Sequence, residues 1–117
     1  YVVSDAQRDE LFVGLCLRES SQAWSRQGDI TIEDAASWCQ QVDSDIVVTG
    51  PALPQIATRL PASCAQLDLG PSVPQASHVA TIGLRLWQAG ETSDGRTLEP
   101  LYLRKSAAEE QRDRRSR

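Results

Sequence analysis

Three carboxylates gather near the start of the chain, around a short polar stretch. Asp5 ends a segment with the pattern of a strand, and Asp9 and Glu10 follow the polar residues after it. Carboxylates at a strand end can hold a divalent cation or act as an acid–base pair. The alternative is a polar hairpin turn in which Arg8 balances the charge. We favour the turn, and predict neither a catalytic residue nor a metal site here.

A second candidate lies where a predicted strand meets a predicted helix, at Thr49-Gly50-Pro51. The N-terminus of a helix binds anions through its free amide groups and its dipole. Thr49 and Gly50 are therefore candidate cofactor-binding residues. Pro51 removes one amide donor, however, and no glycine-rich run lets a phosphate come close. We therefore favour a helix-starting turn and expect no cofactor.

The remaining residues with reactive side chains are few. The single histidine, His78, lies near the start of a predicted helix without a carboxylate neighbour, so we interpret it as structural. Cys16, Cys39 and Cys64 are widely spaced and stand in apolar settings, which favours free buried thiols in a reducing cytoplasm over disulfides or zinc. The sequence also lacks a Walker-type phosphate loop, a dinucleotide-binding glycine motif and a serine nucleophile elbow.

Composition limits the partners that the chain can bind. Its 117 residues are 24% charged and 40% hydrophobic, with a formal net charge of −4. A net-acidic domain is a poor autonomous binder of nucleic acid. The basic residues of the C-terminal end are either a solvated chain end or a contact for phosphate. No apolar run reaches the ~20 residues of a membrane span.

The hydrophobic pattern predicts a mixed α/β fold with the order β-β-β-α-β-α-β-α. The first two strands are expected at Tyr1–Asp5 and Glu10–Leu17, and a third near Gln22–Arg26. Capping residues Thr31 and Asp34 predict a first helix that ends near Asp43-Ser44. The later elements are expected in this order: a strand at Asp45–Thr49, a helix from Pro51 to Leu60, a strand at Cys64–Leu69, a helix after Ser72–Gln75 closed by Gly90, and a short extended piece at Leu101–Leu103.

The expected core follows from the same pattern. Its members are apolar residues on the strand faces and helix stripes: Val3, Leu11, Val13, Leu15, Ile46, Val48, Leu53, Ile56, Leu60, Ile82 and Leu86. We expect one lobe over residues 1–106 and a charged, flexible tail over residues 107–117. The chain contains no methionine and opens on a strand, so we also expect that an N-terminal domain of the parent protein is missing.

Four stretches resemble one family in the right order along the chain. The segment Val3–Phe12 resembles the "I-D-A-R-x-G-E-V-Y/F" opening of the second half of TsaB (YeaZ-like) proteins, with Gln7 and Asp9 replacing the usual arginine and glycine. Ile30–Ala35 is similar to the family's "hydrophobic-x-P-E-E" helix start, and Val47–Gly50 to its "V-x-G-x-G" strand and turn. Leu98–Ser106 resembles the "x-E-P-x-Y-L-R" ending.

The resemblance implies a ribonuclease-H-like or actin-like lobe, in a family once described as glycoprotease-like. It implies a cytoplasmic, non-catalytic scaffold in tRNA threonylcarbamoyladenosine modification. The implied partners are a TsaD-like catalytic subunit and a TsaE-like ATPase, with tRNA met indirectly and a homodimer formed mainly through the N-terminal half. The alternative is a nucleotide-binding or hydrolase lobe that uses Thr49 and Gly50, or Asp5 and Glu10.

Overall fold

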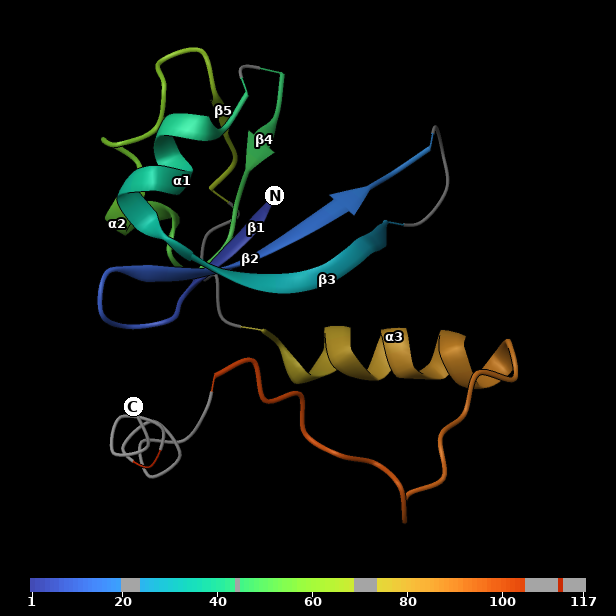
Figure 1. The fold of residues 1–117 in the computed structure, drawn as a ribbon. Coiled ribbons are helices and arrows are strands. Elements are labelled where there is room, and N and C mark those ends of the chain that lie inside the picture. The colour runs from blue at the N-terminus through green and yellow to red at the C-terminus, as the bar shows by residue number, and fades with distance from the viewer. Residues whose placement is uncertain (20–23, 44, 69–73, 105–111, 113–117) are drawn as a thin grey trace. The chain divides into compact units, whose positions relative to one another are not determined.

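The computed structural model describes residues 1–19, 24–43, 45–68, 74–104 and 112. The chain forms two compact units, residues 1–72 with 103–117, and residues 73–102. The predicted mixed α/β class is confirmed, and the elements of both units are drawn in Figure 1. The predicted single lobe over residues 1–106 stays a prediction. Apart from Arg112, the expected tail at 107–117 lies outside the described residues.

The first unit is built on an antiparallel sheet with the order β1-β2-β3. Its strands are β1 (Val2–Asp5), β2 (Glu10–Leu17) and β3 (Ser25–Asp34). Val3 pairs with Val13, and Phe12 pairs with Ile32 on the next strand. The β2–β3 register shifts between Val13 and Leu15, so Gly14 marks the irregularity that its lack of a side chain allows.

A parallel pair lies on the other side of β1. Its strands are β4 (Val47–Val48) and β5 (Ala65–Gln66). A single parallel bridge joins Val2 to Thr49, where the Val3 amide donates to the Thr49 carbonyl (2.8 Å) and the Thr49 amide donates to the Tyr1 carbonyl (2.9 Å). The β1 strand therefore has neighbours on both sides, β2 and the segment that contains β4.

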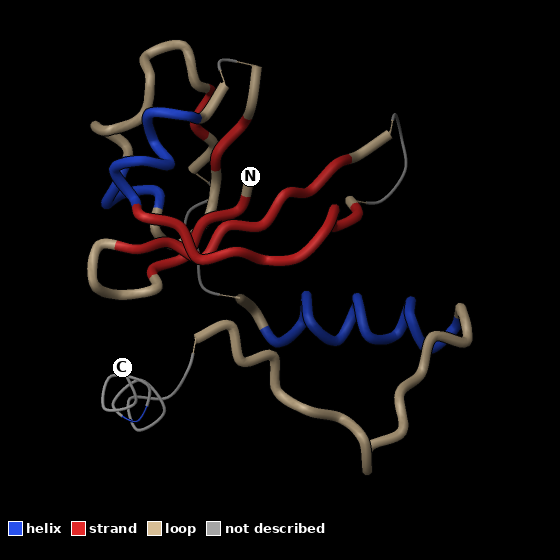
Figure 2. The backbone as a smooth tube through the Cα atoms, in the orientation of Figure 1, coloured by secondary structure: helices blue, strands red, loops and turns tan. Residues whose placement is uncertain are grey.

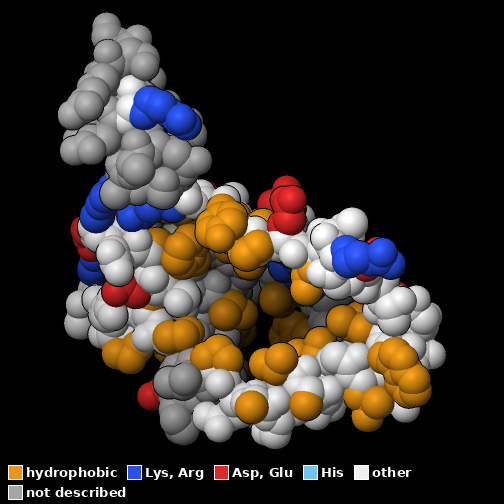
Figure 3. Space-filling view, turned by 90° about the horizontal axis from the view of Figure 1, so that it is seen from below, with side chains coloured by type: hydrophobic (Ala, Val, Ile, Leu, Met, Phe, Trp, Pro, Cys, Tyr) orange, Lys and Arg blue, Asp and Glu red, His pale blue; other side chains and the backbone are white. Residues whose placement is uncertain are grey.

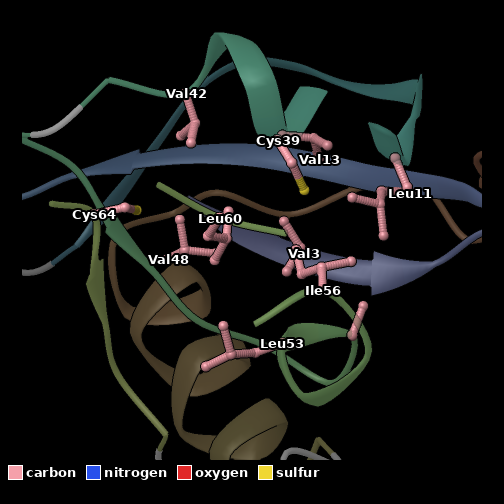
Figure 4. Packing of buried hydrophobic residues seen from close by; sticks show 12 residues of the cluster. Val3, Leu11, Val13, Cys39, Val42, Val48, Leu53, Ile56, Leu60 and Cys64 are labelled. Carbon is pink, nitrogen blue, oxygen red and sulfur yellow. The ribbon is translucent and has the colours of Figure 1, made fainter. Parts of the chain in front are cut away.

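Two short helices cover one face of these strands. Asp34 caps α1 (Ala35–Gln41) by accepting a hydrogen bond from the Ser37 amide (2.8 Å). The helix α2 (Leu53–Ile56) has a proline in its first turn, where the amide would be unpaired in any case. The core lies between these helices and the strands (Figure 4). Cys39 of α1 faces Val3 of β1, and Ile56 of α2 lies below Val3 in this view.

The second unit contains α3 (Ala76–Gln88) and the irregular segment after it. Gly90 takes the left-handed conformation (φ 79°), and the Glu91 amide donates to the Leu86 carbonyl (2.9 Å), so the predicted glycine stop is confirmed. Ser72, the expected cap, lies outside the described residues. Residues 101–103 form no strand. Among the described residues, no helix has the length and apolar character needed to cross a membrane.

The predicted third strand was placed too early in the chain, and the predicted first helix was too long at both ends. The third strand is β3, which runs through the expected helix start, and Thr31 lies inside it opposite Val13. Ile30 and Ile32 extend the strand because they lie over the same face as Phe12 of the neighbouring strand. The helix therefore begins at Ala35 and ends at Gln41.

The predicted core is confirmed at seven positions of the first unit and wrong for α3. Seven of its members are buried, namely Val3, Leu11, Val13, Val48, Leu53, Ile56 and Leu60, whereas Leu15 and Ile46 are half-buried. Ile82 and Leu86 are 52% and 42% exposed. Helical spacing creates an apolar stripe on α3 but does not bury it. The space-filling view shows such hydrophobic side chains at the surface (Figure 3).

Candidate functional site

The turn between β1 and β2 holds the three carboxylates, and it has an unusual backbone. Gln7, Arg8 and Asp9 all take positive φ angles, of 63°, 57° and 58°. The left-handed conformation costs an L-residue about 1–2 kcal/mol, and three consecutive residues without glycine accumulate that cost. The turn is the loop that joins the first two strands in Figure 2. Contacts outside the turn must therefore hold it.

Two backbone hydrogen bonds close the turn, and a third ties it to α1. The Ala6 amide donates to the Glu10 carbonyl (2.9 Å), and the Glu10 amide donates to the Gln7 carbonyl (3.0 Å). The Ala35 amide, at the start of α1, donates to the Asp9 carbonyl (2.9 Å). Asp5 also contributes, because its carboxylate accepts the Gln7 amide (2.7 Å). The first carboxylate of the candidate site is thus part of the turn itself.

Asp9 forms a two-pronged ion pair with Arg59, which follows α2. The guanidinium donates from both terminal nitrogens to the two carboxylate oxygens, at 2.8 and 3.1 Å. This bidentate geometry is the strongest form of an arginine–carboxylate contact. The hydrogen bond from Arg59 lowers the pKa of Asp9, and Asp9 in turn raises the pKa of Arg59. Asp9 therefore stays ionised and engaged at neutral pH.

Glu10 is paired with a residue from the opposite end of the chain. The Arg104 guanidinium contacts the Glu10 carboxylate across a separation of 94 residues. The two side chains are 23% and 37% exposed, so the contact is partly shielded from water. The ion pair connects the first hairpin with the segment that follows Leu103.

These contacts decide what the carboxylates can do. The turn borders a concavity of about 340 Å³, but each acid already has a partner: a backbone amide for Asp5, Arg59 for Asp9 and Arg104 for Glu10. In the described ranges no three His, Cys, Asp or Glu side chains converge in a way that could hold a metal ion. The arrangement is a clamp that fixes a strained turn, and it does not resemble an acid–base pair poised over a substrate.

The Thr49-Gly50 junction has a structural explanation as well. A Cβ on Gly50 would lie 2.3 Å from the Val3 carbonyl oxygen, and the φ angle of Gly50 is 119°. Glycine is therefore needed for the close packing of this turn on β1. The nearby amides already donate within the chain: Thr49 to Tyr1, Ala52 to Val3, and Leu53 to Gly50. These donors are not free to bind a phosphate.

The other candidates are scattered. His78 lies exposed on α3, and its structural role stays a prediction. The three cysteines are free thiols; Cys39 and Cys64 are buried, whereas Cys16 is only half-buried, which corrects the prediction for that residue. Burial raises the pKa of the Cys39 thiol and suppresses its reactivity.

Sequence reasoning missed both arginines of the clamp. Arg59 lies 50 residues after Asp9, and Arg104 lies still further from Glu10. Local spacing in the sequence therefore predicts neither ion pair. The only available signal was the position of Glu10 and Arg104 in two separate stretches of the family resemblance. Compared with protein-family models and with curated proteins, the chain matches none of them.

Proposed function

We propose that this chain is the C-terminal lobe of a TsaB-like protein and serves as a non-catalytic partner in tRNA threonylcarbamoyladenosine modification. The observation that carries the proposal is the ion pair between Glu10 and Arg104. Glu10 belongs to the stretch that resembles the family's opening motif, and Arg104 to the stretch that resembles its ending. Two motifs found independently in the sequence therefore meet in space.

The architecture supports the same proposal at a coarser level. A lobe of the actin-like type is a mixed sheet with helices packed on it, and the chain has β1 between an antiparallel and a parallel neighbour. Fold likeness alone does not give function. It makes the proposed scaffold role compatible with the structure of the first unit.

The chemistry of the turn favours support over catalysis. Catalysis requires a positioned acid, base, nucleophile or metal with access to substrate. The carboxylates of the turn are engaged by Arg59, Arg104 and the Gln7 amide. In this proposal the chain works in the cytoplasm, where it stabilises a TsaD-like catalytic subunit in a complex that also contains a TsaE-like ATPase.

Reconstitution tests the proposal. The protein that carries this chain is mixed with the TsaD-like and TsaE-like subunits of the same organism, and both complex formation and threonylcarbamoylation of tRNA are measured. We expect co-elution with the TsaD-like subunit and modification that depends on the chain. Failure of the purified proteins to associate, with no effect of the chain on modification, would refute the proposal.

Charge reversal then tests the observation behind it. Glu10→Arg and Arg104→Glu should each weaken complex formation, and the double variant should restore it, because the ion pair is rebuilt with the charges exchanged. His78→Ala is the control, since His78 is exposed and lies outside the turn. Loss of modification by Asp5→Ala with an intact complex would instead point to a catalytic role.

A titration with ATP and Mg²⁺ separates the scaffold from the alternative nucleotide-binding lobe. The amides around Gly50 are engaged within the chain, so we expect no heat of binding at micromolar protein. Clear micromolar binding by this chain would count against the scaffold and in favour of the alternative.

A further inference from the structure

A second cavity, of about 260 Å³, opens beside α1 on the first unit, away from the carboxylate turn. Its wall includes two aromatic rings, two carboxylates and, among its aliphatic side chains, two that follow α1: Tyr1, Trp38, Glu33, Asp43, Val42 and Ile46. The strand β3 contributes Glu33, α1 contributes Trp38, and Val42 and Asp43 follow the helix. Figure 4 shows Val42 at the end of α1, pointing toward the sheet.

The two rings form a fixed pair. Tyr1 and Trp38 meet edge to face, with their centroids 5.6 Å apart and their planes at 90°. This is a preferred geometry for aromatic contacts. Both rings are half-buried against the core, so they are held in place by packing. Ring faces attract cations through their negative charge density.

The two carboxylates of this cavity differ from those of the turn. Asp9 is neutralised by Arg59, whereas the side chains of Glu33 and Asp43 form no hydrogen bond or ion pair with the part of the chain that the structure describes. No lysine, arginine or histidine side chain lines the cavity, and the α-ammonium of Tyr1 already donates to the Val47 carbonyl (2.6 Å). The two carboxylates therefore outnumber the one cationic group of the wall, which leaves net negative charge next to two aromatic rings.

We infer that this cavity binds the guanidinium group of an arginine side chain presented by a partner protein. A guanidinium is planar, so it stacks on aromatic rings, and its fork of donors matches carboxylates. The aliphatic stem of the arginine packs on Val42 and Ile46, which are apolar. The inference is independent of the proposed function, because it rests on the charge and shape of a different part of the surface.

The probe is N-acetyl-arginine amide, and the reporter is Trp38. The variant Trp24→Phe with Trp87→Phe removes the other two tryptophans, so the fluorescence reports on the cavity alone. A saturable change in fluorescence is expected. The citrulline analogue, which has the same shape but no charge, should bind at least about tenfold more weakly.

Two isosteric variants test the carboxylates. Glu33→Gln and Asp43→Asn, made in the same reporter background, should each weaken binding by about tenfold, because each removes one charge partner of the guanidinium. Asp29→Asn is the matched control: it removes one exposed charge from β3 outside the cavity and should leave binding unchanged.

Three results would overturn the inference. The first is equal binding of the arginine and citrulline probes. The second is unchanged binding in both Glu33→Gln and Asp43→Asn. The third is markedly tighter binding by a chain shortened to end at Arg104, which would assign the cavity to the arginines of the chain's own C-terminal end. Equal binding by the shortened and the full chain supports a site for a partner.

Discussion

Gly50 gives the sharpest test of the structure, because its replacement by alanine meets two independent penalties. At a φ of 119°, a residue with a side chain is strained by about 1–3 kcal/mol. The added methyl group would also lie 2.3 Å from the Val3 oxygen and 2.8 Å from the Val3 nitrogen. Both atoms are backbone in the centre of the sheet, so no side-chain rotation relieves the contact.

Relief requires β1 to move away from the turn that contains Gly50. That movement stretches two hydrogen bonds, from the Val3 amide to the Thr49 carbonyl (2.8 Å) and from the Ala52 amide to the Val3 carbonyl (3.3 Å). Each contributes about 0.5–1.5 kcal/mol. We therefore expect Gly50→Ala to lower the free energy of unfolding by about 2–6 kcal/mol, a large part of the ~5–15 kcal/mol typical of a domain.

Urea unfolding, followed by tryptophan fluorescence and far-ultraviolet circular dichroism, measures the loss. The matched control is Gly28→Ala, because Gly28 also has a positive φ (67°) but no atom within 4 Å of the added Cβ. It should cost only about 1 kcal/mol, from the left-handed backbone. If Gly50→Ala lowered stability no more than Gly28→Ala, the close packing of this turn on β1 would be refuted.

Three further predictions concern the core, the ion pair and the thiols. Ile56→Ala should cost about 2–5 kcal/mol in urea unfolding, because Ile56 is 1% exposed, and a loss below about 0.5 kcal/mol would contradict its packing. Because Arg59 lowers the pKa of Asp9, wild type should exceed Asp9→Asn in stability above the ordinary aspartate pKa of about 3.9, and the difference should vanish as pH falls through the lower pKa of the folded state. Stability curves from pH 2 to 7 check this, with a pH-independent difference as the contrary result. At pH 8 a thiol reagent should modify Cys16 well before Cys39, because burial raises the pKa of the Cys39 thiol. Mass spectrometry of the labelled protein checks the order, and the opposite order would show that the core is open.

Local patterns were sufficient where the residues of an element alone carry the signal. The alternation over Glu10–Leu17 predicted β2 with the bounds that the structure has. The boundary between β3 and α1 was predicted wrongly, since Thr31 and Asp34 are both good capping residues. What decides between them is pairing with β2, a contact that the local pattern of β3 does not contain.

The candidate site shows the same division. The carboxylates and the atypical turn could be found from residue types, since Gln7 and Asp9 depart from the pattern of the resembling family. Their partners could not, because Arg59 reaches Asp9 only after α2 is folded against the sheet. The spacing on α3 likewise indicates an apolar stripe, whereas burial depends on a covering surface that spacing does not encode.

The pairing of β1 on both sides has a consequence for how the chain folds. The β1–β2–β3 meander joins neighbours in sequence and can close early, whereas the Tyr1–Val47 contact closes a loop of 46 residues and forms late. Until the β4 segment arrives, one edge of β1 stays unpaired, and such an edge recruits strands from other molecules. Refolding should therefore compete with association, so its yield should fall as protein concentration rises.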